Sequence, residues 1–300
     1  MTKKLSDWKE TLVAYGFLSP WFIGFIFFTG GPIIAAFVLS LTRWDLLGSP
    51  EFVGLDNYRT LFLGEHSQFW HTLRATFIYT ILSVVVTIIA SLLLAVLLNF
   101  KKIKFIGIFR FIYFIPAVMP TVAMAAIFRL MLHNEMGIIN HFLQTLGVSG
   151  TPNWLNDTFW VWPTLAVLSI FTFSTGQMMM IFNAALKEVP QPLYEACDLE
   201  GANFFQRFIY VTLPGISPII LFNTVVATVN SFNASFTVIY PLTGGGPSAE
   251  TTVLSLSIFQ YAFRMFNMGY ASAMAVILFI IVACIAAIQF RISKKTVTYD

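Results

Sequence analysis

The stretch YEACDLEGANFFQRFIYVTLPGISP, residues 194–218, interrupts a chain that is otherwise strongly apolar. It carries four charged residues, a glycine inside a helical pattern and a Leu-Pro pair near its end. In the whole chain 57% of the 300 residues are hydrophobic, only 10% are charged, and the mean hydropathy is +0.78. Soluble domains are about 25% charged, so this composition indicates an integral membrane protein.

Six apolar segments around this stretch are long enough to cross a bilayer, which takes a helix of about 20 residues. We therefore predict an all-α polytopic membrane protein with six transmembrane helices in a single transmembrane domain, residues 1–300. Glycine and proline at residues 30–32, and Pro116 and Pro120 in the third segment, predict bends or breaks. The predicted spans cover residues 12–41, 72–98, 105–132, 159–182, 215–240 and 268–290.

Basic residues orient these spans, because cytoplasmic loops are enriched in lysine and arginine. We expect both termini and the loop of residues 187–213 in the cytoplasm, and the loop of residues 133–158 outside. Residues 52–62 predict a short interfacial helix, and TGGGP at residues 243–247 predicts a tight external turn. The cytoplasmic regions hold twelve of the seventeen basic residues: Lys3, Lys4, Lys9, Lys101, Lys102, Lys104, Arg110, Lys187, Arg207, Arg291, Lys294 and Lys295.

Several kinds of chemistry are missing from the sequence. No G-x-x-x-x-G-K-[ST] loop is present, so the chain does not hold ATP by that route. The span centres carry almost no charge, which argues against an ion-coupled transporter and against a membrane-embedded enzyme. Cys197 and Cys284 do not predict a structural disulfide, and no H-x-x-x-H pair occurs. We therefore expect no catalytic residue, no metal site and no cofactor in this chain.

Neutral hydrogen-bonding residues instead gather in the predicted spans at residues 159–182 and 215–240. In membranes such side chains commonly tie helices to one another. Asparagines among phenylalanines also suit a neutral, hydroxyl-rich solute, whose ring faces stack while its hydroxyls find donors and acceptors.

The quoted stretch resembles the cytoplasmic EAA loop of ABC importer permeases, which reads E-A-A, three residues, G and later I-x-L-P. Glu195-Ala196, Gly201 and Leu213-Pro214 match it, Cys197 replaces the second alanine, and Val211 holds the aliphatic position. The stretches LSPWFIGFIFFTGGPIIAAFVLSLTRWD, FVGLDNYRTLF, FIYFIPAVMP and LTGGGPSAETTVLSLSIFQYAF resemble the carbohydrate-importer branch, the maltose-type permeases. The resemblance covers nearly the whole chain, and GLDNY and TGGGP resemble the first of the two paired permeases.

This resemblance implies a type I importer in the cytoplasmic membrane of a prokaryote. The implied partners are a second homologous permease, two cytoplasmic ATPase subunits that bind ATP and Mg, and an extracytoplasmic solute-binding protein. The implied cargo is a sugar or oligosaccharide, and no nucleic acid is involved. An importer of a non-sugar solute, such as a glycerol-phosphate ester, is the alternative.

The resemblance assigns the loop to ATPase coupling, and its physical chemistry fits that role. Glu195 to about Asn203 predicts two helical turns, Gly201 allows a sharp bend, and Leu213-Pro214 should end the cytoplasmic segment. A helix lying on the membrane surface is the alternative. The candidate coupling residues are Glu195, Ala196, Asp198, Gly201, Ala202, Phe204, Phe205, Leu213 and Pro214.

The resemblance also implies a solute passage on the fourth and fifth spans, with Phe232 or Phe236 as a stacking surface. Helix packing is the alternative role for each candidate residue. A passage without a solute site, which leaves selectivity to the binding protein, is a further alternative. The candidate passage residues are Ser174, Gln177, Asn230, Ser231, Asn233 and Ser235.

Overall fold

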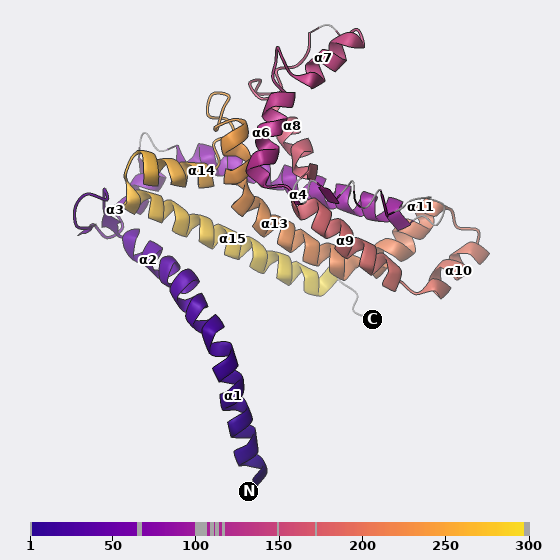
Figure 1. Cartoon of the computed structure of the whole chain (residues 1–300), viewed down its shortest axis with the longest axis horizontal. Helices are drawn as coiled ribbons and strands as arrows, with labels where there is room; N and C mark the ends of the chain where they lie inside the picture. Colours follow the sequence, from indigo (N-terminus) through magenta and orange to yellow (C-terminus); the bar gives the residue numbers. More distant parts are fainter. Residues whose placement is uncertain are drawn as a thin grey trace. The chain divides into compact units, whose positions relative to one another are not determined.

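A computed structural model describes residues 2–64, 68–99, 107–108, 111, 114–115, 118–148, 150–171 and 173–296, with all their side chains except those of residues 2–7, 9, 173–174 and 293–296. Nearly all of the regular structure in this part of the chain is helical (Figure 1). The chain divides into two compact units. One comprises Met1–Ser67 and Ile258–Leu278, and the other comprises Gln68–Ser257 and Phe279–Asp300.

The first unit begins with a long helix that contains one π-helical turn. Helix α1 (Thr2–Phe25) continues through the π-turn η1 (Ile26–Gly30) into α2 (Gly31–Leu39). Pro32 lies in the first turn of α2 and has no backbone N–H to donate. The Gly31 N–H bonds to the Ile26 carbonyl, five residues back. The break expected at residues 30–32 is therefore a local change of helix type.

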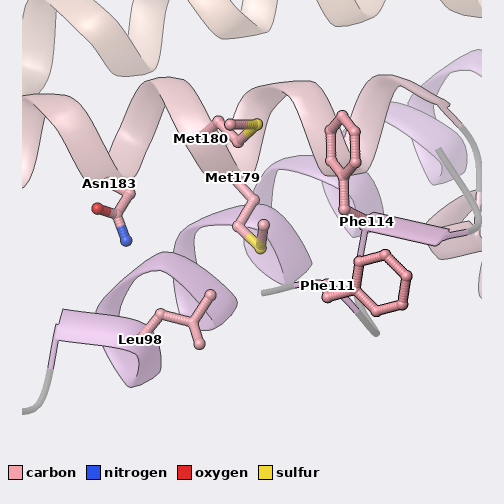
Figure 2. A pocket seen from close by; sticks show the side chains of 6 residues that line it. All are labelled: Leu98, Phe111, Phe114, Met179, Met180 and Asn183. Atoms are coloured by element: carbon pink, nitrogen blue, oxygen red, sulfur yellow. The ribbon is translucent and has the colours of Figure 1, made fainter. Parts of the chain in front are cut away.

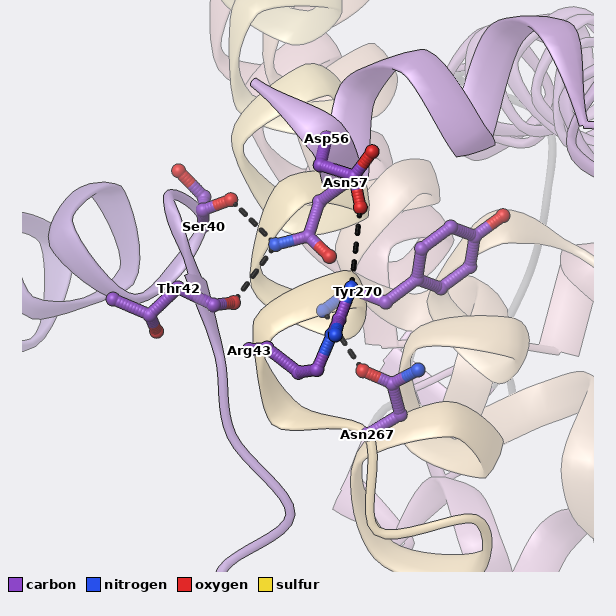
Figure 3. Close-up of polar contacts among 7 residues, drawn as sticks. All are labelled: Ser40, Thr42, Arg43, Asp56, Asn57, Asn267 and Tyr270. Atoms are coloured by element: carbon purple, nitrogen blue, oxygen red, sulfur yellow. Dashed lines mark hydrogen bonds and ion pairs between the residues drawn. The ribbon is translucent and has the colours of Figure 1, made fainter. Parts of the chain in front are cut away.

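A small hairpin and a short helix follow in the first unit. Their bounds are β1 (Thr42–Arg43), which pairs antiparallel with β2 (Glu51–Phe52), and α3 (Asp56–Leu63). Asn57 Nδ2 donates to the carbonyl oxygens of Ser40 and Thr42, both at 2.8 Å (Figure 3). Arg43 forms an ion pair with Asp56 at 3.4 Å. The short helix expected in residues 52–62 is present as α3, and the Asn57 side chain bonds it to the end of the long helix at Ser40.

The first unit also contains the π-turn η4 (Gln260–Arg264) and the beginning of α15 (Met268–Thr296), which packs against the hairpin. The Met268 N–H donates to the Trp44 carbonyl at 2.9 Å. A Cβ atom at Gly269 would overlap the Thr42 carbonyl oxygen and lie 3.2 Å from Asn57 Nδ2. The close approach of α15 to the hairpin therefore requires a glycine at position 269.

The second unit contains α4, α9 and α13, which lie side by side (Figure 1). It also holds the start of α14 and the later part of α15. The bounds are α4 (Phe69–Asn99), α6 (Thr121–Met131), α7 (Ile138–Thr145), α8 (Val161–Leu168), the 3-10 turn η2 (Ser169–Phe171), α9 (Phe173–Glu188), α10 (Gln191–Leu199), α11 (Phe204–Arg207), the π-turn η3 (Phe208–Thr212), α12 (Leu213–Gly215), α13 (Ser217–Leu242) and α14 (Leu254–Phe259).

Two clusters of buried apolar side chains hold the second unit together. We call them outer and inner after the predicted external and cytoplasmic loops beside them. Because lipid tails are as apolar as these side chains, close packing stabilises the clusters more than the hydrophobic effect does. The outer cluster comprises Tyr79, Ala125, Leu132, Leu155, Val161, Leu165, Leu168, Val238, Ile239, Leu242, Val253 and Leu256. The inner cluster comprises Ala95, Leu98, Met178, Met179, Phe182, Ala185, Val189, Ile216 and Ala227.

Four of the predicted spans are single long apolar helices in the described residues. They are Glu10–Leu39, Phe69–Asn99, Ser217–Leu242 and Met268–Ile292. The predicted third span, residues 105–132, appears as α6 in its second half, and most of its first half lies outside the described residues. The count of six spans remains a prediction.

The predicted span at residues 159–182 is bent, which we did not expect. Val161–Phe171 and Thr175–Glu188 meet at 57°. The Ser169 hydroxyl donates to the Ala166 carbonyl at 2.6 Å, and the Thr175 hydroxyl donates to the Ser169 carbonyl at 3.1 Å. Hydroxyls that bond to backbone carbonyls favour helix bending. At this break the Thr175 hydroxyl also gives the Ser169 carbonyl a hydrogen-bond donor.

The glycine-rich stretch after α13 forms a compact turn. Gly245 has a φ of +97°, a left-handed conformation that favours glycine. The Thr251 hydroxyl donates to the Gly246 carbonyl at 2.6 Å, and the Thr252 hydroxyl donates to the Gly245 carbonyl at 3.2 Å. Both threonines are buried. The expected turn is therefore tight, and hydrogen bonds from Thr251 and Thr252 stabilise it.

Replacing Gly269 with alanine tests the close approach of α15 to the hairpin. Overpacking a well-packed site costs about 1–3 kcal/mol, so we expect Gly269→Ala to lower the apparent Tm of the detergent-solubilised protein by several degrees. Gly16→Ala is the control, because a Cβ atom there meets no atom within 4 Å. Equal melting temperatures for the two variants would contradict the described packing.

Candidate functional site

The loop of residues 187–213 folds as two short helices joined at a glycine. Helix α10 begins after Pro190 with Pro192 in its first turn. Gly201 has a φ of +74°, the left-handed conformation that commonly ends helices. Helix α11 begins with a capping box. In it, Asn203 Oδ1 accepts from the Gln206 N–H at 3.0 Å, and Gln206 Oε1 accepts from the Asn203 N–H at 2.8 Å.

Two side-chain contacts close this loop on itself. Asp198 of α10 forms an ion pair with Arg207 of α11. The hydroxyls of Tyr194 and Thr212 lie 3.0 Å apart. The loop therefore has stabilising contacts of its own, and Asp198, a candidate coupling residue, has a partner inside the loop.

Two boundaries of the loop differ from the sequence-based expectation. Helix α10 covers Gln191–Leu199 and not Glu195–Asn203, because Pro190 precedes its first turn and the left-handed Gly201 ends it. Leu213-Pro214 does not interrupt the helical structure. The pair opens the helical turn α12 directly after η3, since proline is tolerated in the first turn of a helix.

The exposed surface of the loop combines apolar and acidic side chains. Leu199 and Phe205 are 90% and 71% exposed, and Phe204 is also exposed. Glu195 and Ala196 are exposed on α10. This combination suits a partner groove that offers apolar contacts and a basic residue.

A polar cavity of about 570 Å³ lies among α4, α6, α9 and α13. Eight of its twelve lining residues carry an amide or a hydroxyl, and no charged residue is among the described residues that line it. The polar lining residues are Tyr79, Ser83, Thr87, Thr121, Gln177, Asn230, Ser231 and Asn233, and the apolar ones are Val84, Val226, Ala227 and Ala234.

Four of the six candidate passage residues meet at this cavity, namely Gln177, Asn230, Ser231 and Asn233. Ser235 does not line it: its hydroxyl is buried and lies 2.7 Å from the Ser255 hydroxyl. The side chain of Ser174 lies outside the described residues.

The two candidate stacking rings also point elsewhere. Phe232 is buried, with its ring 6.4 Å from that of Phe77 in an edge-to-face arrangement. Phe236 stacks on Tyr240 at 5.3 Å. Neither ring is among the described residues that line the cavity, so both pack within the helix bundle.

Helix α4 supplies one wall of the cavity that our reading of the sequence missed. Tyr79, Ser83 and Thr87 line the cavity one helical turn apart, and Thr121 faces it from the start of α6. A signal was present, because hydroxyl residues recur every three or four positions from Thr72 to Ser91. In a helix this spacing places them on one face.

The cavity lies between the two apolar clusters. Tyr79 belongs to the outer cluster and also lines the cavity. Ala227 belongs to the inner cluster and also lines the cavity. A polar layer thus separates two layers of packed apolar side chains along α4 and α13.

A second cavity of about 280 Å³ has a different lining. Leu98, Phe111, Phe114, Met179, Met180 and Asn183 surround it (Figure 2). A single amide among apolar and aromatic side chains gives few partners for a hydroxyl-rich solute. Within the described residues no group of three or more His, Cys, Asp and Glu could hold a metal ion. The candidate sites are therefore the loop and the polar cavity.

The whole chain has close relatives among known proteins. The family model of the binding-protein-dependent transport system inner membrane component matches residues 88–298. The probable ABC transporter permease protein YesP of Bacillus subtilis is 39% identical, over 100% of this chain and 96% of its own length. The trehalose/maltose transport system permease protein MalF of Thermococcus litoralis is 31% identical, over 98% of this chain and 97% of its own length.

A solved structure shares the fold. It is a crystal structure of a bacterial alginate ABC transporter in complex with an alginate pentasaccharide-bound periplasmic protein. One of its chains matches with a TM-score of 0.83 and 22% identity, over 97% of this chain and 96% of that chain. This likeness shows that the two chains share a fold. The chain belongs to the family of binding-protein-dependent transport system inner membrane components, the permease subunits of ABC transporters.

Proposed function

We propose that this chain is the permease subunit of an ATP-driven importer that moves a sugar or oligosaccharide by alternating access. The observation that carries the proposal is the uncharged cavity lined by amides and hydroxyls. Sugars offer many hydroxyls and no charge, and neutral amides and hydroxyls both donate to and accept from them. The trehalose/maltose permease supports the same class of solute. The alginate transporter supports a carbohydrate cargo but not an uncharged one, because alginate is an acidic polysaccharide.

The same lining argues against the alternative cargo, a glycerol-phosphate ester. A phosphate group is bound best by arginine, lysine or several backbone N–H groups. No cationic side chain is among the described residues that line the cavity. The lining therefore favours a hydroxyl-rich carbohydrate over a phosphate ester.

We propose six spans with both termini in the cytoplasm. Four long apolar helices and one bent pair account for five spans, and α6 accounts for part of the sixth. The distribution of lysine and arginine supplies the orientation. In this arrangement the loop of residues 187–213 is cytoplasmic, and the loop of residues 133–158, with α7, is external.

The cytoplasmic loop is proposed as the contact with an ATPase dimer. Its bonded helices form a rigid unit, and Glu195, Leu199 and Phe205 are exposed for a partner. Rigidity matters because a loop that deforms would absorb the ATPase movement before it reached α9 and α13. ATP and Mg would bind to the ATPase subunits.

The full transporter is proposed to contain a second, homologous permease and an extracytoplasmic solute-binding protein. The family name includes dependence on a binding protein, and the alginate transporter structure contains a periplasmic protein. Two alternatives for selectivity stay open: the cavity selects the solute, or it encloses a solute that the binding protein has already selected.

Substitutions in the cavity distinguish these two alternatives. One neutral hydrogen bond contributes about 0.5–1.5 kcal/mol, so Gln177→Ala and Asn230→Ala should each raise the apparent KM for solute uptake about two- to tenfold. Ser235→Ala is the control, because Ser235 lies on the same helix as Asn230 and does not line the cavity. An unchanged KM in both cavity variants would show that the cavity does not select the solute.

A charge reversal tests the coupling loop. We expect Glu195→Lys to abolish binding-protein-stimulated ATP hydrolysis, or to release the ATPase during purification, because it would repel a basic residue of the partner. Glu51→Lys reverses a charge on the exposed β2 strand and should have no effect. Normal co-purification and normal stimulated hydrolysis by Glu195→Lys would refute this contact.

A panel of solutes tests the cargo class. The reconstituted transporter with its binding protein would be assayed for ATP hydrolysis with trehalose, maltose, lactose, an alginate pentasaccharide and glycerol 3-phosphate. We expect at least one uncharged sugar to stimulate hydrolysis and glycerol 3-phosphate to leave it at the basal rate. Stimulation by glycerol 3-phosphate alone would overturn the sugar assignment.

A further inference from the structure

An asparagine in α13 is buried without any hydrogen-bond partner. Asn223 is fully buried, and neither Oδ1 nor Nδ2 of its amide is bonded. Four other residues in the described part of the chain bury one unbonded side-chain atom each: Thr80, Thr164, Ser217 and Gln289. Among the described residues, Asn223 is the one whose amide lacks a partner for both its donor and its acceptor.

Apolar residues of the inner cluster share a helix face with this amide. Ile216 and Ala227, members of the inner cluster, lie seven residues before it and four residues after it. Ile219 and Ile220 pack against the same cluster. In a helix these four positions share a face with residue 223. Asn223 is therefore a polar residue inside the inner cluster.

The position of Asn223 along α13 relates it to the cavity. Asn230, which lines the cavity, is seven residues further on, so it lies on the same helix face two turns away, about 10 Å along the axis. Ala227, between them, contributes to both the cavity and the inner cluster. The face that carries Asn230 thus continues through Ala227 to Asn223, beyond the inner end of the cavity.

A buried, unbonded amide is costly, because it has lost its water and gained no partner. A leucine at this position would have the same branched arrangement of heavy atoms, with larger terminal groups, and would match the apolar cluster. The Asn223 amide would gain hydrogen-bond partners in a second conformation, in which the residues of the inner cluster move apart and water or solute reaches the amide.

We propose that Asn223 is a passage-lining residue of the inner half of the transporter. In the described conformation the inner cluster covers it. When the cluster separates, the stripe of Asn230, Ala227 and Asn223 forms a continuous wall, and the Asn223 amide meets the hydroxyl-bearing solute after it leaves the cavity. The inference rests on the proposed function, since it extends the same passage inward.

Thiol accessibility tests the inference in the full transporter. The two cysteines of the chain, Cys197 and Cys284, would be changed to serine, and Asn223→Cys would be introduced. The complex in lipid nanodiscs would be treated with a charged methanethiosulfonate reagent, without nucleotide and after trapping with ATP and vanadate. We expect the modification rate, followed by the intact mass of this subunit, to differ at least about tenfold between the two states.

Two further cysteine variants separate the possible failures. Val225→Cys lies on a different face of α13 and is also buried, so it should stay unreactive in both states. Asn230→Cys lines the cavity and should react in at least one state. If Asn230→Cys never reacts, the proposed passage itself is wrong. If Asn230→Cys reacts and Asn223→Cys never does, or if Val225→Cys reacts as fast as Asn223→Cys, the inference about Asn223 is wrong.

The thermal stability of Asn223→Leu gives a second, independent reading. If the amide is covered without a partner in the resting transporter, leucine removes that cost, and the apparent Tm of the purified complex should rise. A structural role, such as holding a buried water molecule, predicts the opposite shift. Asn183→Leu on α9 is the control for the larger leucine side chain, because Asn183 is also buried and lies outside the cavity stripe. A Tm for Asn223→Leu that is as low as that of Asn183→Leu, or lower, would overturn the inference.

Discussion

The structure depends on one constraint: at membrane depth every polar group needs a partner within the protein. The chain meets it largely within single helices. The Thr76 hydroxyl donates to the Thr72 carbonyl at 2.7 Å, and the Thr228 hydroxyl donates to the Thr224 carbonyl at 2.7 Å. A hydroxyl bonded in this way still has free acceptor capacity. Helices can therefore carry polar residues through the bundle and present them to a solute at little cost.

The polar layer and the two apolar clusters follow from the same constraint. Apolar side chains at the two ends of α4 and α13 pack closely, while the amides and hydroxyls between them leave a cavity of about 570 Å³. A few hydrogen bonds join helices that are far apart in the sequence. The Leu254 N–H donates to the Thr76 hydroxyl at 2.8 Å, and Gln289 Nε2 donates to the Thr228 hydroxyl at 2.9 Å. Among the described residues, Asn223 is the one whose amide lacks a partner for both its oxygen and its nitrogen, so we assign it a role in a second conformation.

The sequence-based predictions were most accurate for elements whose structure depends on residues close in the sequence. The bend at Gly201 and the helix at residues 56–63 follow from residues within one or two turns. They were less accurate where a distant partner decides the outcome. The role of the α4 hydroxyls depends on α9 and α13, which lie against α4.

The sequence by itself determined the membrane environment, the approximate spans and the helical character of the loop of residues 187–213, because composition and short-range spacing carry that information. Only the tertiary structure decided which polar residues face the cavity. Ser231 and Ser235 are both serines, one turn apart on α13, yet Ser231 lines the cavity and Ser235 bonds to Ser255. The difference arises because packing against helices far away in the sequence sets what each side of α13 meets, and no local pattern contains those contacts.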